Sequence, residues 1–379
     1  MRLIHSTDEF QLSQQPYPDV PILLDRNGAI VVPALQFLIH QCLHRGRVRS
    51  AATWTAYGEA LYDYFGYLEG AGHAWEQRQK AGIPSILARY RDWALKRNKE
   101  STVNFRLRLV VRFYRWARDR GLIGELPFDD EAVVRRAGGG MLVHAQRLTS
   151  TTSPDILLKQ RREVFPVLSK GQVAEVLHAV AGNPTHYLIV LLGLQTGLRR
   201  MELATFPEHY VMNGGMAGPD RRVFPVLLDP AHVQIKGRQK RTIHLTRHLL
   251  DQLWQYRHTY RPMLARRHGG AEPATLFLTA DGGPFTNGGM GKIFEAISRR
   301  VGYKVHCHML RHTYATHTLH ALRSAMNIGN ALLYLRERMG HSHISTTEKY
   351  LHYLEQIEDG VLNDYQREVD QLFAGGVTL

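Results

Sequence analysis

Hydrophobic residues recur every three or four positions over much of this chain, which is the spacing of helices that bury one face. The first such stretch covers residues 53–70 and includes Trp54, Leu61 and Leu68. The second begins near Ser101, a residue type that caps helices, and runs to Arg120. We therefore expect a helical domain over residues 45–137. The inner face of its second helix would consist of Leu107, Val110, Val111, Tyr114 and Ala117.

The pattern is weaker at the start of the chain and again before its middle. Residues 1–44 contain several prolines and no sustained period, and only residues 30–43 could form a helix. We treat residues 1–44 as an N-terminal extension of unknown structure. Three glycines at 138–140 and the sequence RLTSTTSP at 147–154 have the composition of a linker, which we place over residues 138–165.

A second domain is expected over residues 166–355. Ser169 and Gln172 form a capping-box signature for a helix that ends at Val180. Two short stretches, 223–228 and 233–245, have strand-like patterns, and apolar residues alternate with polar ones on both sides of a turn in the second. This stretch predicts a β-hairpin with Lys236 at its bend.

Helical patterns cover most of the remaining sequence, so the predicted fold class is mainly α with a small β-sheet (α+β). The length of 379 residues indicates two domains, or three, at roughly 150 residues per domain. A tail helix over residues 356–379 is also expected. Its apolar stripe would consist of Val361, Leu362, Tyr365, Val369, Leu372 and Phe373.

The net charge points to a polyanionic partner. The chain has 48 Lys and Arg residues against 34 Asp and Glu residues, a formal charge of +14. Four arginines of the second helix lie on one side of it, where guanidiniums could meet successive phosphates of DNA. The alternative is an ordinary solvated helix face. These four residues are Arg108, Arg112, Arg115 and Arg118.

Two other features limit the class of protein. The longest apolar run, residues 187–194, is far shorter than the ~20 residues of a membrane-spanning helix, and the first residues lack the apolar core of a signal peptide. We expect a soluble cytoplasmic protein, associated with the nucleoid if its partner is DNA. Cys42 and Cys307 are the chain's two cysteines, so the sequence supports neither a disulfide framework nor a thiolate-rich metal site.

Four short motifs occur in a fixed order along the second domain. They are T-G-L-R at 196–199, I-K-G-R at 235–238, H-M-L-R-H at 308–312 and M-G-H-S-H-I-S-T-T-E-K-Y at 339–350. Together they resemble the catalytic domain of the tyrosine recombinase (phage integrase) family over residues 166–355. Residues 45–137 resemble that family's helical core-binding domain by pattern. The resemblance implies a helical core-binding domain followed by a mixed α/β catalytic domain.

The resemblance also implies a reaction. Tyr350 would attack a phosphodiester of double-stranded DNA, which forms a 3′-phosphotyrosyl link and frees a 5′-hydroxyl. A phenol has a pKa near ~10, so a neighbouring group must take its proton. In the family this group corresponds to His308. Arg199 and Arg311 correspond to the pair of guanidiniums that bind the phosphate oxygens.

The remaining roles follow from the same resemblance. Lys236 would protonate the leaving 5′ oxygen, and His341 would hydrogen-bond the phosphate and pack against the helix of the nucleophile. Glu202, one turn beyond Arg199, would hold that arginine by an ion pair. Because the energy of the broken bond is kept in the phosphotyrosine, the reaction requires no cofactor and no metal.

Several residues compete for these roles. Arg200 adjoins Arg199, but the T-G-x-R spacing selects Arg199. Lys240 lies on the same hairpin as Lys236, and the position before Gly237 fits the family better. Tyr314 and Tyr353 compete with Tyr350, which alone lies at the family's interval from the G-H-S motif; the alternative for both is packing in the core or against DNA.

The histidines near His308 could be misread as a zinc site. His308 and His312 are four residues apart on a predicted helix, but the glutamate of the H-E-x-x-H motif is missing between them. We interpret His312 as a buried structural histidine and His343 as a surface or DNA-facing one. A metalloenzyme would contain stoichiometric zinc on elemental analysis.

Two insertions distinguish this chain from compact family members. Residues 212–231 lengthen the path from Arg199 to Lys236, and residues 321–332 lengthen the path from Arg311 to His341. Such insertions are usually loops, and they argue against a close assignment to the chromosome-dimer resolving branch.

The first functional hypothesis is an integrase or transposase of a mobile element. In the resembling family the tail docks on a neighbouring protomer, so that a homotetramer holds two DNA sites. The free protein would be a monomer or weak oligomer, and accessory proteins could direct it. The alternatives are a type IB topoisomerase, which uses the same chemistry alone, and a DNA-binding protein without catalysis.

Overall fold

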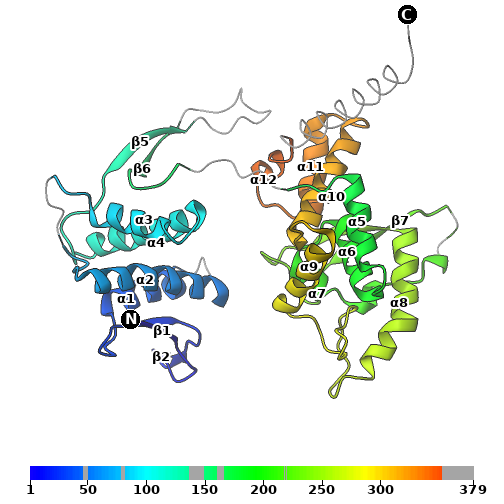
Figure 1. Cartoon of the computed structure of the whole chain (residues 1–379), viewed down its shortest axis with the longest axis horizontal. Coiled ribbons are helices and arrows are strands. Elements are labelled where there is room, and N and C mark those ends of the chain that lie inside the picture. The colour runs from blue at the N-terminus through cyan, green and yellow to red at the C-terminus, as the bar shows by residue number, and fades with distance from the viewer. Residues whose placement is uncertain are drawn as a thin grey trace, which may run out of the picture. The chain divides into compact units, whose positions relative to one another are not determined.

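The computed structural model describes residues 1–45, 50–77, 82–135, 149–159, 166–216, 218 and 220–351. The described residues up to 159 form one compact unit, and those from 166 onward form another (Figure 1). Both units are mainly helical with small two-stranded antiparallel sheets, which confirms the predicted fold class. No helix among these residues is long and apolar enough to cross a membrane. The tail helix expected over residues 356–379 lies outside the described residues.

Four α-helices and one π-helical turn form most of the described part of the first unit. They are α1 (Val32–Ile39), the π-helix η1 (His40–His44), α2 (Ala51–Ala71), α3 (Ile86–Leu95) and α4 (Glu100–Asp119). Helix α4 begins at Glu100, one residue before the expected start, and it buries the five residues predicted for its inner face. Within the core, the Tyr64 and Tyr114 hydroxyls are 2.6 Å apart.

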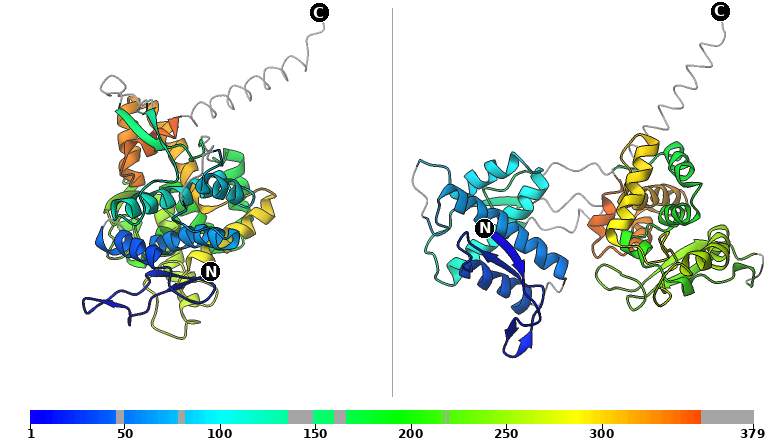
Figure 2. Two further views of the ribbon diagram at one scale, coloured as in Figure 1. Left: turned by 90° about the vertical axis from the view of Figure 1, so that its left-hand side faces the viewer. Right: turned by 60° about the horizontal axis from the view of Figure 1, so that its bottom comes forward.

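Residues 1–44 belong to this core, whereas the sequence indicated an extension of unknown structure. Strand β1 (Arg2–His5) pairs with β4 (Pro21–Leu24), and the short strands β2 (Gln11–Leu12) and β3 (Gln15–Pro16) pair with each other. Leu23 and Phe37 lie in the same core as α2 and α4. A Cβ on Gly58 of α2 would lie 2.4 Å from Pro21, so the strands approach this helix closely (Figure 2).

The expected linker, residues 138–165, is partly ordered structure of the first unit. Strand β5 (Asp130–Arg135) pairs with β6 (Thr149–Pro154), and Ile156 is buried. The buried Asn104 side chain of α4 donates to the Leu158 carbonyl and accepts from the Leu158 N–H, both at 2.9 Å. Ser and Thr suit both linkers and exposed strands, so composition did not distinguish them. Residues 136–148 and 160–165 lie outside the described part.

The second unit packs its helices around one apolar core and a smaller cluster at the C-terminal end. Its α5 helix has the predicted capping box at Ser169 and ends at Val180. The elements are α5 (Lys170–Val180), α6 (Pro184–Thr196), α7 (Arg200–Ala204), the 3₁₀ turns η3 (Glu208–Tyr210) and η4 (Gly214–Met216), β7 (Val223–Leu228), β8 (Arg241–Thr246), α8 (Arg247–Ala265), α9 (Asn287–Val301), α10 (Cys307–Arg323), α11 (Ile328–Met339) and α12 (Ile344–Glu348).

The β-hairpin uses a different first strand from the one predicted. Strand β8 pairs with β7, and residues 229–240 connect them. Val233 and Ile235 are buried in that connection instead of forming a strand. Every second residue of β7 points into the core, so β7 is the better partner for β8. The insertion expected as a loop at 212–231 therefore contains a strand, while Lys236 lies in the connection.

The second expected insertion is also mostly regular structure. Helix α10 extends to Arg323, and α11 begins at Ile328. Ala331 and Leu332 are buried in the cluster that also contains Tyr350. The insertion at 321–332 therefore lengthens two packed helices, and only residues 324–327 connect them.

Candidate active site

A glycine places the first candidate arginine. Gly197 ends α6 in the left-handed region, with φ 64°, and Arg199 follows as the N-cap of α7. A Cβ at Gly197 would lie 2.5 Å from Tyr314 and 3.0 Å from the Met339 sulfur, so a larger residue would push α10 and α11 away. The T-G-L-R motif thus needs its glycine for both backbone conformation and close packing.

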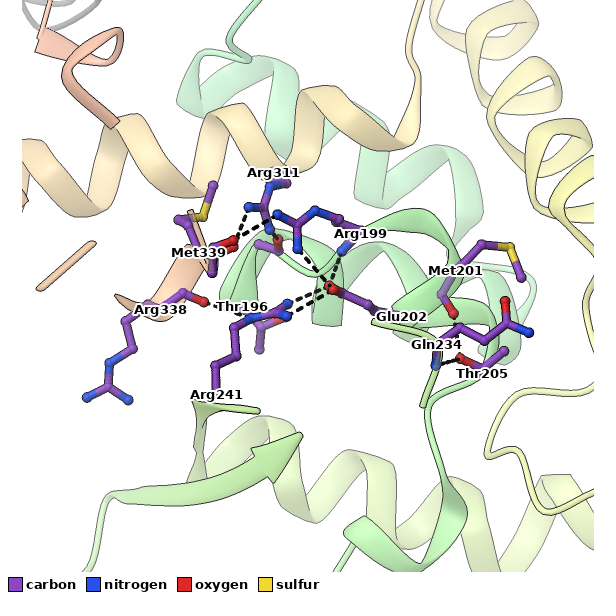
Figure 3. A network of polar contacts seen from close by, with 12 residues as sticks. Thr196, Arg199, Met201, Glu202, Thr205, Gln234, Arg241, Arg311, Arg338 and Met339 are labelled. Atoms are coloured by element: carbon purple, nitrogen blue, oxygen red, sulfur yellow. Dashed lines mark hydrogen bonds and ion pairs between the residues drawn. The ribbon is translucent and has the colours of Figure 1, made fainter. Parts of the chain in front are cut away.

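The fully buried carboxylate of Glu202 joins two arginines (Figure 3). It accepts from the Arg199 backbone N–H at 2.7 Å and from Arg199 Nη1 at 3.1 Å, so the expected ion pair is present. Arg241 of β8 donates to both oxygens, at 2.9 and 2.5 Å. Burial raises the pKa of Glu202, but hydrogen bonds and charges of Arg241 and then Arg199 outweigh it and hold this pKa below its usual range.

Arg311 of α10 is held by backbone carbonyls. Its Nη1 donates to Gly197 O at 2.6 Å, and its Nη2 donates to Met339 O at 2.5 Å (Figure 3). The side chain is buried, and burial together with the charge of Arg199 lowers the pKa of Arg311. A guanidinium still carries its charge at neutral pH. Glu202 thus binds the guanidiniums of Arg199 and Arg241, whereas the guanidinium of Arg311 contacts two backbone carbonyls and His341.

His341 lies between this group and the tyrosine helix. Its Nε2 is 3.0 Å from Arg311 Nη2, and its Nδ1 is 2.9 Å from the Thr347 hydroxyl on α12. Because a guanidinium only donates, Nε2 accepts here and the proton of the neutral ring is on Nδ1. The His341 and Tyr350 rings stack nearly parallel, with centroids 6.3 Å apart and planes at 12°. His341 therefore links the arginines to the tyrosine.

Tyr350 is buried, and its hydroxyl contacts His312, a residue predicted from the sequence to be structural. The hydroxyl is 3.1 Å from His312 Nδ1. His308, the expected proton acceptor, is exposed and packs edge-on against the His312 ring, with centroids 4.4 Å apart. The structural interpretation of His312 is therefore incomplete. The sequence did contain a sign of this contact: His312 lies one helical turn after His308, so both rings lie on the same side of the helix.

The site holds these histidines in the neutral form. Burial and then the charge of Arg311 lower the pKa of His341 to about 3. Burial, His308 and Arg311 lower the pKa of His312 to about 3, and partial burial followed by Arg311 lowers that of His308 to about 4. Neutral imidazoles can accept protons at neutral pH.

These depressed values predict a loss of stability in acid. In the unfolded chain a histidine takes up its proton near pH 6.5, before the folded protein does, so the free energy of unfolding falls as the pH drops from 6.5 toward 4. The buried His312 alone should contribute about 1.4 kcal/mol per pH unit in this window. Urea unfolding at pH 6.5 and 5.0 tests this. His312→Gln should flatten the dependence by about that amount, and an equally steep variant would refute the assignment.

Lys236 is exposed in the connection between β7 and β8. The competing Lys240 forms an ion pair with Asp229, with Nζ and Oδ2 2.6 Å apart. Residues just before Lys236 are held by Gln234 N, which donates to Thr205 Oγ1 at 3.0 Å. Because Lys240 is paired with Asp229 and Lys236 is exposed, Lys236 is the more available of the two lysines to a substrate.

Two cavities open at the site, and the lining of each includes several cationic side chains. One, of about 900 Å³, is lined by Arg199, Arg200, Arg299, Lys304 and His308 among others. The other, of about 740 Å³, is lined by Lys236, Arg241, Arg336, Arg338 and His341 among others. Such surfaces suit a phosphate backbone. Within the described residues, no group of three or more His, Cys, Asp and Glu side chains could hold a metal ion.

Known families match both units. Residues 166–356 match the phage integrase family, and residues 36–121 match the N-terminal SAM-like domain of phage integrases. This chain belongs to the phage integrase family. The resemblance inferred from the motifs is thus confirmed, and the chain is a tyrosine recombinase, an enzyme that breaks and rejoins DNA.

Relatives of this phage integrase family member include tyrosine recombinases of bacteria. It is 27% identical to tyrosine recombinase XerC of Bacillus subtilis over 254 residues, 66% of this chain and 70% of the relative. Its fold is similar to that of the XerH recombinase bound to difH substrate, with a TM-score of 0.57 at 13% identity over 90% of this chain and 92% of the other. The Tn1549 transposon integrase has a TM-score of 0.54 at 18% identity over 84% and 94%.

The four arginines on α4 of this recombinase differ in their surroundings. Arg108 is exposed, and Arg112 lies over the Tyr57 ring, with 5.1 Å from its guanidinium carbon to the ring centre. Arg115 pairs with Asp130 at 2.6 Å, and Arg118 pairs with the adjacent Asp119 at 3.3 Å. Two members of this face thus already have carboxylate partners, so their contributions to DNA binding should differ.

Proposed function

We propose that this recombinase acts on specific sites in double-stranded DNA and joins Tyr350 covalently to the 3′ phosphate. The main support is the excess of positive charge beside a tyrosine hydroxyl. The guanidiniums of Arg199 and Arg241 share one buried carboxylate, that of Arg311 contacts His341, and the Tyr350 ring stacks on His341. A phosphodiester would neutralise part of this excess. Arg199 and Arg311 would bind its non-bridging oxygens.

Cleavage forms one bond and breaks another. The Tyr350 oxygen attacks phosphorus, and the bond from phosphorus to the 5′ oxygen breaks. The phenolic proton moves to the His312–His308 pair, with His312 as the immediate neighbour and His308 as the exposed ring that can exchange the proton with water. The arriving phosphate brings negative charge, which raises the affinity of both rings for a proton. In this structure, His341 Nε2 accepts from Arg311. To donate to the phosphate, the ring must instead carry its proton on Nε2.

The leaving 5′ oxygen takes a proton from Lys236 and becomes a hydroxyl. An ammonium at the end of a flexible side chain can act as this general acid. A 5′-hydroxyl from another strand reverses the step and completes strand exchange. No cofactor takes part in these reaction steps, because the phosphotyrosine keeps the energy of the broken bond.

The biological role we propose is integration or transposition of a mobile element by a homotetramer on two DNA sites. The structure of the Tn1549 integrase, similar in fold, is that of a complex with a circular intermediate DNA, and XerH is bound to difH substrate. The test incubates the protein with a suicide substrate that is made from the DNA flanking the protein's gene. A nick in this substrate lets the cleaved strand diffuse away, so that the covalent adduct accumulates. We expect an adduct at the element boundary. An adduct at an unrelated chromosomal site alone would contradict the mobile-element role, and no adduct at any site would contradict the chemistry.

The arginine face of α4 gives a separate prediction for DNA binding. The double variant Arg108→Ala/Arg112→Ala should weaken binding and reduce the slope of log K against log salt by about one unit per lost phosphate contact. Arg115→Ala serves as the matched control, and its slope should change less because Arg115 is paired with Asp130. Fluorescence anisotropy at several salt concentrations measures the slopes. Equal slopes for all proteins would make this face an ordinary solvated surface.

A further inference from the structure

We propose that Arg241 is a positioning residue that fixes the loop carrying Lys236 to the helix that carries the phosphate-binding arginine. This inference rests on the proposed function, because it concerns the general acid of that reaction. Arg241 would act through the backbone of residues 235–240 and would not touch DNA itself. None of the four motifs includes Arg241, although β8 points Arg241, Ile243 and Leu245 to the same buried side.

The Arg241 side chain contacts two other segments of the catalytic unit, α7 and the end of α11. Its side chain is 5% exposed, and two of its nitrogens bind the two oxygens of Glu202 (Figure 3). Its Nε donates to Arg338 O at 3.1 Å at the end of α11. A Cβ on Gly340 would lie 2.9 Å from Arg241 Cδ, so the backbone before His341 packs directly on this side chain.

The other end of the loop is attached to the same helical segment. Gln234 N donates to Thr205 Oγ1 at 3.0 Å, and Thr205 is the C-cap of α7 (Figure 3). Glu202 lies inside α7, and Arg199 is its N-cap. The loop with Lys236 is therefore held at both ends by α7, at Thr205 on one side and Glu202 on the other. Its position is coupled to that of Arg199.

Folding alone gives little reason for a buried arginine at this place. A well-packed apolar residue is often as stabilising as a buried ion pair, because both charges lose their hydration. The bidentate contact instead restricts the Arg241 side chain to one geometry, and it thereby fixes the position at which the loop enters β8. The Lys236 side chain is long and flexible, so the placement of its backbone determines how often its ammonium reaches the leaving oxygen.

The test compares two DNA substrates that differ at the scissile bond. One has the normal 5′ oxygen, and the other has sulfur in its place. A thiol has a pKa near ~8.5 and leaves without a general acid, so the sulfur substrate does not need Lys236. Lys236→Ala is the reference variant: it should cleave the oxygen substrate about 10²-fold or more slowly and the sulfur substrate nearly normally.

Arg241→Gln should reproduce this pattern in milder form. We expect its single-turnover cleavage of the oxygen substrate to fall about tenfold or more, while the sulfur substrate stays within about twofold of the wild-type rate. Arg241→Lys keeps the charge and should recover part of the loss. Thr205→Val removes the other attachment and should shift the ratio of the two rates in the same direction, whereas Thr205→Ser, which keeps the hydroxyl, should not.

Arg261→Gln is the matched control for the loss of a buried arginine. Arg261 of α8 is 2% exposed and is paired with Glu208 at 3.0 Å. This variant should lose stability but cleave both substrates with the wild-type ratio. Circular dichroism confirms that each variant is folded, and Thr205→Val tests the proposal if Arg241→Gln does not fold.

Two outcomes would overturn the inference while the proposed function stands. In one, Arg241→Gln slows both substrates equally, which would place its effect on the phosphate-binding arginines or on folding. In the other, Arg241→Gln and Thr205→Val both leave the ratio of rates unchanged. If the wild-type protein attaches to neither substrate, the proposed function fails, and this inference fails with it.

Discussion

Tyr350→Phe forms no detectable covalent adduct with DNA and binds its site with nearly wild-type affinity; this is the expected result for the proposed nucleophile. The substitution removes the oxygen that would attack phosphorus and leaves the ring that stacks on His341. Loss of an enzyme's nucleophile lowers the rate by a factor on the order of 10⁶ in well-studied cases. Affinity should persist because the cationic side chains that meet the phosphates are unchanged.

The measurement uses the suicide substrate and denaturing gels for the adduct, together with a native gel shift for binding. Tyr353→Phe is the matched control, three residues further along the chain, and it should form adducts as the wild type does. Adducts with Tyr350→Phe and none with Tyr353→Phe would reverse the assignment of the nucleophile.

Glu202→Ala should destabilise the catalytic unit more than any single change at its surface. The variant leaves the guanidiniums of Arg199 and Arg241 without the carboxylate that they share. Removal of one partner from a buried ion pair typically costs about 3–5 kcal/mol, because the remaining charge is buried without compensation. The midpoint of thermal unfolding should fall by about 10 °C, given a shift of roughly 2–4 °C per kcal/mol for units of this size.

Calorimetry or circular dichroism on heating measures this effect. Asp229→Ala is the control, since it also removes a carboxylate from an ion pair, but one with the exposed Lys240. We expect little change in its unfolding midpoint because solvent screens that pair. If both variants unfold at the same temperature, Glu202 does not hold the arginines together.

Local signals predicted part of the molecule well. The face that α4 buries follows from its period, and the start and end of α5 follow from its capping box. The pair of Arg199 and Glu202 follows from their spacing, since both lie in the first turn of a short helix. These features all involve residues a few positions apart, which is why the sequence alone predicts them.

Other features depend on contacts between distant segments. The N-terminal strands pack on α2, and β6 pairs with β5 across a long stretch of chain, so neither could be recognised from composition. Arg241 meets Glu202 across 39 positions, and the contact of His312 with Tyr350 spans 38. Whether β8 pairs with 233–235 or with β7 was decided by burial, which the alternation alone does not reveal.

The backbone contacts of Arg311 have a consequence for the energetics of the reaction. A long side chain that must become ordered when a substrate arrives loses up to about 2 kcal/mol of conformational entropy. Arg311 is already fixed by the carbonyls of Gly197 and Met339, so this loss occurs when the domain folds. For the proposed role of Arg311 as a phosphate ligand, the site is therefore preorganised: this charge would need little rearrangement as the phosphorus becomes five-coordinate, which would lower the reorganisation energy of the transition state.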